Sequence, residues 1–300
     1  MMGLSLVKTH NFMATARVLV VGGGASGGGA GDISNAQTAG GGSGGQVQDI
    51  ASHTITPQTY TVTVGAGGTI PSATANGNDG GSSIFDTITS VGGGGGCHST
   101  SGAPAANSGA YGGGGHGYYN DAYALGSSGT VAYQGGNGNL GSPYHGGGGG
   151  GAGGNGQNGY LNYGVGGAGV SSDITGTAVT YGGGGGGNRA SSGTAANGTD
   201  GGGSGGTWSS AGVDGAANRG GGGGGGGGIY NPGAGGSGFV CVRWTTSDFG
   251  TCSVTGTGNT IDTTTVVGQS IAKFIVSGTL TIVAAPIPPG AGLMMNLIRK

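Results

Sequence analysis

Glutamate is absent from this chain, and lysine and arginine together account for only 8 of its 300 residues. Recognition of nucleic acid requires a basic surface that neutralises phosphates, and electrostatic membrane binding requires a polybasic segment. Neither class of partner is therefore expected. Because glutamate and lysine are favoured on exposed helix faces, their scarcity also argues against a helical domain.

Motifs that carry catalysis or metal binding are also missing. The three cysteines, Cys97, Cys241 and Cys252, and the five histidines lack metal-ligand spacing, and no nucleophile elbow has a plausible acid and base. Cys241 and Cys252 could face each other on neighbouring strands, but spacing does not establish a disulfide. We expect no enzyme activity, no cofactor and no bound metal.

One apparent cofactor motif is set aside for a physical reason. Residues 22–27 match G-x-G-x-x-G directly after an apolar segment, which is the fingerprint of dinucleotide binding. That fingerprint needs a helix after the third glycine to receive the pyrophosphate. The following residues have no helical periodicity, so a nucleotide site is not expected.

No targeting or membrane-spanning segment is expected. Residues 1–16 lack the long apolar region of a signal peptide, and the apolar stretch 282–298 is interrupted by three prolines and a glycine. We expect synthesis in a cytosol and release, if at all, only by assembly or lysis.

Glycine dominates what is present, with 87 residues and unbroken runs at 92–96, 112–115, 146–151, 182–187 and 220–228. A segment without side chains cannot fold by burying an apolar face, but its backbone can approach other segments closely. In the polyproline II conformation such segments are three-residue-per-turn helices that can exchange N–H···O=C bonds. Disorder is the alternative, and the low charge content, 6%, argues against it.

Short segments rich in β-branched residues lie next to these runs and predict strands at 17–21, 46–50, 53–56, 59–64, 84–91, 173–181 and 238–244. A turn at Pro57-Gln58 predicts a hairpin. The fold class we expect is all-β or irregular, a bundle of polyglycine II helices stapled by short β-strands.

A change of composition predicts the domain boundaries. Only 7 of the 62 residues from 239 to 300 are glycine, and four Thr/Val/Ile-rich segments follow residue 245. We expect an N-terminal arm at 1–16, a glycine-rich domain at 17–244, and a small antiparallel β module at 245–300 for docking or oligomerisation. The apolar segment 292–298 is expected to be covered by a partner chain.

Five segments occur in an order that resembles the glycine-rich domain of bacteriophage tail fibres and adhesins: RVLVVGGG, TPQTYTVTVGAGG, SSIFDTITSVGGGGG, SSDITGTAVTYGGGGGG and GGSGFVCVRW. The resemblance covers residues 17–244 and implies a structural or receptor-binding protein of the virion. That family commonly has an F-x-x-S-G-T-F-T-V strand before the first segment. Here a similar string, FIVSGTLTI at 274–282, lies near the other end, so the strand is supplied from that end, comes from a neighbouring subunit, or belongs to a separate module.

Tyrosine, histidine and asparagine cluster between residues 111 and 145, in a stretch without lysine or arginine. Rigid tyrosines among Ser, Gly and Asn are typical of binding loops, because tyrosine supplies contact area at a low cost in rotamer entropy. The alternative is that these rings pack against the glycine lattice. The receptor-binding candidates are Tyr111, His116, Tyr118, Tyr119, Asn120, Tyr123, Tyr133, Tyr144, His145 and Trp208.

The function we expect is that of a phage tail-fibre or adhesin component on the virion, which binds a host surface glycan or outer-membrane protein through Tyr/Asn-rich loops. Other virion proteins and further copies of the chain, with a trimer favoured, are the expected partners. The alternatives are a capsid decoration or fibre spacer without receptor binding, and, more remotely, an ice-binding protein.

Overall fold

Strands and glycine-rich segments alternate along the chain in the computed structural model, which describes residues 13–31, 37–99, 105–117, 125–139, 144–190 and 193–286. The elements are β1 (Ala14–Val21), β2 (Val47–Ile55), β3 (Thr59–Thr63), β4 (Ser83–Phe85), β5 (Ile88–Ser90), α1 (Gly159–Asn162), β6 (Val170–Ser172), β7 (Val179–Tyr181), β8 (Phe239–Thr245), η1 (Thr246–Asp248), β9 (Phe249–Val254), β10 (Thr260–Asp262), β11 (Gln269–Phe274) and β12 (Gly278–Ala284). The protein is thus mostly β and irregular, with very little helix among the described residues.

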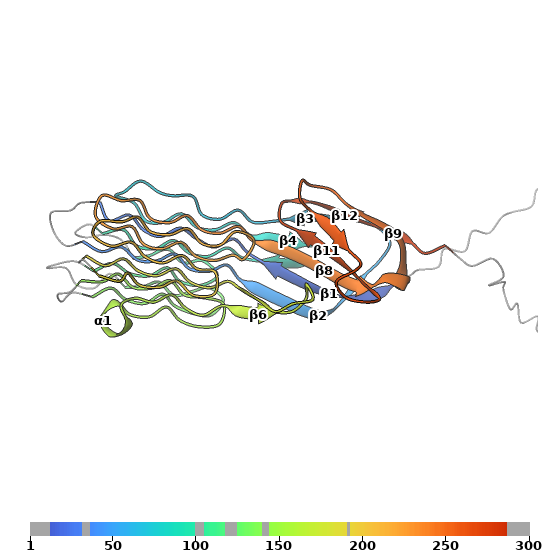
Figure 1. Cartoon of the computed structure of the whole chain (residues 1–300), viewed down its shortest axis with the longest axis horizontal. Coiled ribbons are helices and arrows are strands. Elements are labelled where there is room, and N and C mark those ends of the chain that lie inside the picture. Colours follow the sequence, from blue (N-terminus) through green and yellow to red (C-terminus); the bar gives the residue numbers. More distant parts are fainter. Residues whose placement is uncertain are drawn as a thin grey trace, which may run out of the picture.

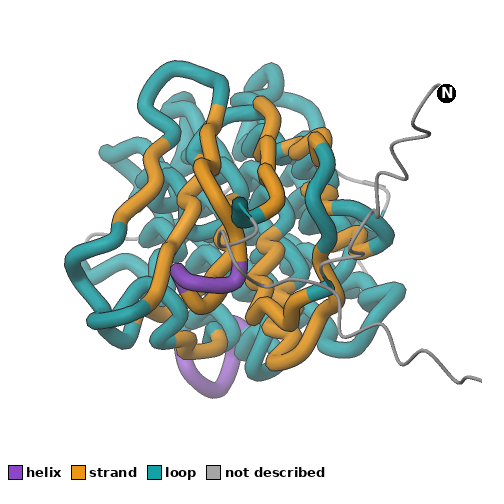
Figure 2. Tube along the Cα trace, turned by 90° about the vertical axis from the view of Figure 1, so that its right-hand side faces the viewer, coloured by secondary structure: helices purple, strands orange, loops and turns teal. Residues whose placement is uncertain are grey.

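Ten of the strands form two antiparallel sheets with the orders β10-β11-β8-β1-β2 and β5-β4-β3-β12-β9. An apolar core that includes Val18, Phe85, Trp244, Phe274 and Leu280 lies between them, so the sheets form a sandwich. Successive side chains of a strand point to opposite faces. The ends of the strands face the viewer in Figure 2, which looks along the molecule from the sandwich end.

The outer face of the first sheet is also covered. Leu19 and Val21 of β1 point away from the sandwich core and join a second apolar cluster with Ile174 and Tyr181. Both of these lie in the β6–β7 hairpin, the third, two-stranded sheet. Burial on both faces explains why the second half of β1, residues 18–21, is continuously apolar and does not alternate.

The strands after residue 245, expected to form a small module of their own, instead join both sheets. β11 pairs with β8, and β12 pairs with β3 and β9. The FIVSGTLTI string supplies the last residue of β11 and the first part of β12, so it does not form a separate module. The change of composition near residue 245 does not separate the sheets.

Three local expectations are corrected by strand pairing. β2 and β3 lie in different sheets, so Pro57-Gln58 is a crossover between the sheets and the predicted hairpin is wrong. Segment 84–91, predicted as a single strand, spans the β4–β5 hairpin, and segment 173–181 contains the turn and second strand of the β6–β7 hairpin. Their turns include Asp86 with φ 52° and Gly176 with φ 96°, backbone conformations that Asp and Gly tolerate better than most residues.

The chain leaves the sandwich four times at the same end. Glycine-rich excursions at 22–46, 64–82, 91–169 and 182–238 run out and return between β1 and β2, β3 and β4, β5 and β6, and β7 and β8. They lie side by side as extended passes and give the molecule its elongated shape (Figure 1). We call the end of the passes far from the sandwich the distal end.

Backbone hydrogen bonds between the passes repeat every three residues. Along 22–29, the N–H groups of residues 22, 25 and 28 donate to residues 46, 43 and 40, those of 23, 26 and 29 to residues 81, 78 and 75, and those of 24 and 27 to residues 236 and 233. Each pass therefore presents three faces, and each face bonds to a different neighbour.

Neighbouring passes lie too close for side chains. A Cβ atom built on Gly222 would lie 2.0 Å from the carbonyl oxygen of Gly42, and one built on Gly24 would lie 2.1 Å from that of Gly221. Glycine is needed at these positions for the close approach of backbones, since neither has a positive φ.

Polar side chains accept some N–H groups of the passes in place of backbone carbonyls. The Oδ1 atom of Asn188 accepts the N–H of Ala39 at 2.9 Å, and an Asp79 oxygen accepts the N–H of Gly95 at 2.9 Å. The Asp214 carboxylate does the same for Ala234. In this way Asn and Asp satisfy amide groups that would otherwise be unpaired.

The longest α-helix among the described residues has four residues, and none of the helices found there could cross a membrane.

Replacing Gly222 by Ala should lower the free energy of unfolding by about 3 kcal/mol or more, because the new methyl group clashes with a carbonyl that is fixed by its neighbours. Gly154→Ala is the matched control, since the nearest atom to its Cβ would be 3.7 Å away. That change should alter stability by less than about 1 kcal/mol. Urea unfolding of both variants measures the difference, and equal midpoints would contradict the close packing of the passes.

Candidate functional site

Chain segments from distant parts of the sequence meet at the distal end. Isolated β-bridges join Thr38 to Gly117 and to Gly227, and join Arg189 to His145 and to Thr207. The described turns at 207–210 and 227–230 adjoin these bridges and lie at one end of the molecule, opposite the sandwich (Figure 1).

Four of the ten candidate residues, Tyr118, Tyr119, Asn120 and Tyr123, lie outside the described residues. Gly117, which directly precedes them, is buried and bridged to Thr38 at the distal end.

Tyr111 lies inside the structure, with only 3% of its surface exposed. Its ring packs against that of Tyr133, with 6.0 Å between the ring centroids, and its carbonyl accepts a 2.7 Å hydrogen bond from the Ser43 hydroxyl. Burial raises the pKa of the Tyr111 hydroxyl. Tyr111 therefore packs against the glycine passes and is not accessible to an external partner, whereas Tyr133 is half-buried.

His116 is also buried, and its Nδ1 atom lies 3.1 Å from the Sγ atom of Cys97. A Cys–His pair is the arrangement of a thiol nucleophile only when the thiolate forms readily. Here burial raises the pKa of Cys97 to about 12. The pair is consequently a packing contact inside the lattice.

His145 is buried beside two residues of the distal end. Its ring lies edge-on to the Tyr163 ring at 5.0 Å, and the Arg189 guanidinium lies 5.7 Å from the centroid of the same Tyr163 ring. Within the described part of the chain, neither ring nitrogen of His145 has a hydrogen-bond partner. Burial, and secondarily the charge of Arg189, lowers the pKa of His145 to about 4. The neighbouring Tyr144 is half-buried.

Trp208 is the described candidate with the clearest access to solvent, with 42% of its surface exposed. Its turn contacts a second turn that sequence reasoning missed, where Ile229 and Tyr230 are 64% and 42% exposed. The two turns are neighbours, because a Cβ atom built on Gly227 would lie 1.8 Å from the carbonyl oxygen of Thr207. Tyr160 and Tyr163 of the α1 region were missed as well and are exposed. The signal that could have found them is a short non-glycine interruption between glycine-rich segments.

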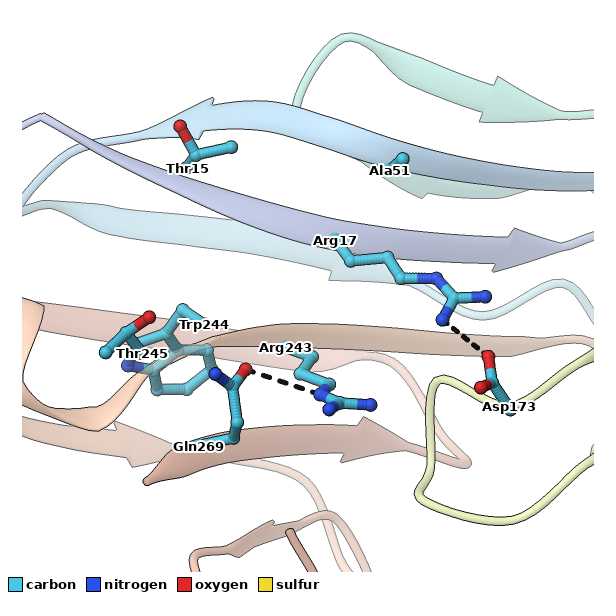
Figure 3. Close-up of a pocket in the computed structure, with 8 residues that line it drawn as sticks. All are labelled: Thr15, Arg17, Ala51, Asp173, Arg243, Trp244, Thr245 and Gln269. Atoms are coloured by element: carbon cyan, nitrogen blue, oxygen red, sulfur yellow. Dashed lines mark hydrogen bonds and ion pairs between the residues drawn. The ribbon is translucent and has the colours of Figure 1, made fainter. Parts of the chain in front are cut away.

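A separate pocket of about 360 Å³ lies on the outer face of the first sheet. It is lined by Thr15, Arg17, Ala51, Asp173, Arg243, Trp244, Thr245 and Gln269 (Figure 3). Arg17 and Arg243 face each other directly across β1 and β8, an arrangement that is unfavourable for two like charges.

Two carboxylates offset that repulsion. Arg17 makes a two-pronged contact with Asp49 at 2.8 and 2.7 Å. It makes a third contact with Asp173 at 2.6 Å (Figure 3). Hydrogen bonds from Arg17 lower the pKa of Asp173, and they lower that of Asp49 even though its burial opposes the shift. Arg243 donates from Nε to Gln269 at 3.3 Å. With two arginines against two aspartates, the pocket has no net charge that would select an anion, and its contacts tie the β6–β7 hairpin to the sheet.

Among the described residues, no group of three or more His, Cys or Asp side chains is placed to hold a metal ion. All three cysteines are free thiols. Cys241 packs on the outer face of the first sheet, while Cys252 packs against the sandwich core, so their side chains do not face each other.

Comparison with known proteins gives one result. Residues 6–245 match the family model described as a glycine-rich domain. No curated protein and no solved structure matches the chain.

Protonation of His145 should destabilise the fold. Because its pKa is lowered in the folded state, the unfolded chain binds a proton first, so stability is complete above about pH 6.5 and is lost as the pH falls toward 4. The loss should reach about 3 kcal/mol at most. Urea unfolding between pH 7 and pH 4.5 measures it.

His145→Leu should flatten this dependence on pH, since an apolar side chain can fill a site where the imidazole makes no hydrogen bond. A smaller slope should remain, because burial also lowers the pKa of His98. An unchanged slope in the variant would show that His145 titrates normally.

Proposed function

The chain belongs to the glycine-rich domain family, and from that premise, together with the position of its exposed aromatic side chains, we propose that it is an attachment component of a bacteriophage tail fibre or adhesin. It acts by binding a structure on the host cell surface, without catalysis. The supporting observations concern the scaffold, the distal turns and the position of the chain ends.

The scaffold in this proposal is a bundle of polyglycine II helices. The supporting observation is the three-residue period of the hydrogen bonds between passes, since this helix has three residues per turn. Asn158, in an extended pass, has φ −68° and ψ 144°, close to the polyproline II values of about −75° and +145°. Such helices hold the distal turns in fixed positions.

The observation that carries the functional proposal is that the described chain ends and the exposed aromatic turns lie at opposite ends of the molecule. β1 begins and β12 ends at the side of the sandwich away from the passes, so the described chain ends leave there (Figure 1). Trp208, Ile229 and Tyr230 are exposed in turns at the opposite end. Exposed aromatic residues are typical anchors of binding surfaces. The sandwich end therefore attaches to other virion proteins and the distal end meets the host.

The proposed receptor is a surface glycan or an outer-membrane protein. Neutral aromatic rings and amide groups suit either one, and the low net charge of the chain removes strong electrostatic steering. Affinity per copy is then modest, and several copies per virion, with a homotrimer as our favoured assembly, multiply it.

A spacer or capsid decoration protein remains the rival function, because the elongated lattice alone would serve it. The exposed aromatic turns favour attachment, since a spacer has no use for three large apolar side chains in solvent at one end. Labelling the chain in electron micrographs of the particle separates the two functions.

The double variant Trp208→Ala/Tyr230→Ala should reduce adsorption of virions to host cells at least about tenfold, because both aromatic anchors are lost. Its unfolding midpoint should stay unchanged, since both side chains are exposed. Val267→Ala is the control: this residue is 95% exposed but belongs to the β10–β11 turn of the sandwich. Normal adsorption by the double variant would remove these turns from the receptor site.

A further inference from the structure

A second polar groove runs along the side of the glycine passes. It has a volume of about 360 Å³ and is lined by Gln134, Gly135, Asn137, Asn155, Gly156, Gln157 and Asn158. Every side chain in this lining is a neutral amide. A lining of this kind suits a ligand rich in hydroxyl groups and offers nothing to an apolar or charged one.

The groove lies between two passes with a regular register. The N–H of Gln134 donates to the Oδ1 atom of Asn155 at 2.9 Å, and three residues later the N–H of Asn137 donates to the Oδ1 atom of Asn158 at 2.8 Å. The N–H groups of Gly156 and Gly159 return bonds to the carbonyls of residues 134 and 137. Side chains three residues apart thus share one face of each pass.

These contacts fix the orientation of the two asparagine amides. A backbone N–H can only donate, so the atom that faces it must be the side-chain oxygen, and the Nδ2 group points the other way. Asn155 and Asn158 are both exposed and both line the groove, so their NH₂ groups are within reach of a ligand that lies in it. At about 3.1 Å per residue, donors three residues apart recur every 9 Å or so along the pass.

A chain of sugar units fits this pattern better than an extended peptide. The carbonyls of residues 134, 137 and 157 already accept hydrogen bonds within the lattice, so the groove offers side-chain amides and few free backbone acceptors. A sugar hydroxyl both donates and accepts and can rotate to suit an amide NH₂ or C=O, whereas the N–H groups of a peptide need acceptors at fixed positions. Two residues beyond Asn158, Tyr160 is 77% exposed and can pack against the apolar face of a sugar ring.

We propose that this groove binds a neutral oligosaccharide lengthwise, with the Nδ2 groups of Asn155 and Asn158 donating hydrogen bonds to hydroxyl oxygens of the sugar chain. The biological meaning of this groove rests on the attachment function proposed above. In that function the groove is a second, glycan-binding contact with the host surface, in addition to the distal turns. The binding itself is measured without cells, so the two proposals can fail separately.

The test uses the full chain labelled with ¹⁵N and three neutral probes: maltohexaose, cellohexaose and the hexamer of N-acetylglucosamine. The side-chain amide signals of Asn155 and Asn158 should shift in a saturable way with at least one probe. Absence of a shift with all three at millimolar concentration would overturn the proposal.

Asn155→Asp/Asn158→Asp is the informative variant. Each carboxylate keeps an oxygen for the backbone N–H, so the lattice contact is retained, while the NH₂ donor is removed. Loss of two ligand hydrogen bonds should weaken binding about tenfold or more. Unchanged affinity in this variant would also refute the site.

Asn218→Asp is the control for charge, because it introduces one carboxylate away from the groove and keeps an oxygen for the Ser237 hydroxyl. It should bind the probe like the parent chain; an equal loss would show a general effect of charge and overturn the assignment. If the double aspartate variant does not fold, two other measurements still locate the sugar-binding site. They are the signal shifts of the wild-type chain and the sugar affinity of Gln157→Ala. Trp208→Ala/Tyr230→Ala should keep the sugar affinity even when adsorption is lost, which separates a failure of this groove from a failure of the distal turns.

Discussion

The structure depends on backbone hydrogen bonds between segments that have no side chains. In a conventional domain the apolar side chains are buried and the backbone follows. Here the passes bury their own peptide groups, and each N–H along 22–29 reaches a carbonyl of one of three neighbours. The same interaction dictates the composition, since a Cβ at Gly222 would collide with a carbonyl of the adjacent pass. Glycine content is therefore a packing requirement and not a mark of disorder.

The sandwich supplies what the passes lack. Ordering a residue costs about 1–2 kcal/mol of conformational entropy, and glycine has the most to lose. Residues such as Trp244, Phe274 and Leu280 bury apolar area between the sheets, and Ile174 and Tyr181 do so where the β6–β7 hairpin covers the outer face of the first sheet. On the exposed sides of the lattice, Asn and Asp oxygens accept backbone N–H groups, as with Asn155 and Asp214. The composition of the non-glycine residues thus follows from position: apolar at the sandwich end, amide and carboxylate along the edges.

Much of this arrangement could be predicted from local sequence. The glycine runs predicted extended passes, and RVLVV and GFVCVRW predicted buried strands, now β1 and β8. Strand pairing could not be predicted, because the sequence of a Thr/Val/Ile-rich segment does not indicate which strand it pairs with. In the structure β11 pairs with β8 and β12 pairs with β3. The turn at Asp86 was missed because only the backbone conformation, not the residue type, distinguishes it from a continuing strand. The density of tyrosine favoured Tyr111 as a candidate, but it is buried, while the exposed Tyr230 lies in a short Ile-Tyr-Asn-Pro interruption of the glycine-rich sequence. Burial depends on neighbours far away in sequence, and no local pattern reports it.

The position of β8 has a consequence for biosynthesis. This strand lies between β1 and β11 at the centre of its sheet, yet more than 200 residues separate it from β1 along the chain. Likewise, one of the three faces of the pass at 22–29 forms its hydrogen bonds only with residues 233–236, near the other end of the chain. Contacts of such long range form late and slowly. The ribosome must therefore release nearly the whole polypeptide before the sheet can close, and until then the nascent glycine segments depend on their solubility, and on any chaperone present, to avoid pairing with the wrong copy.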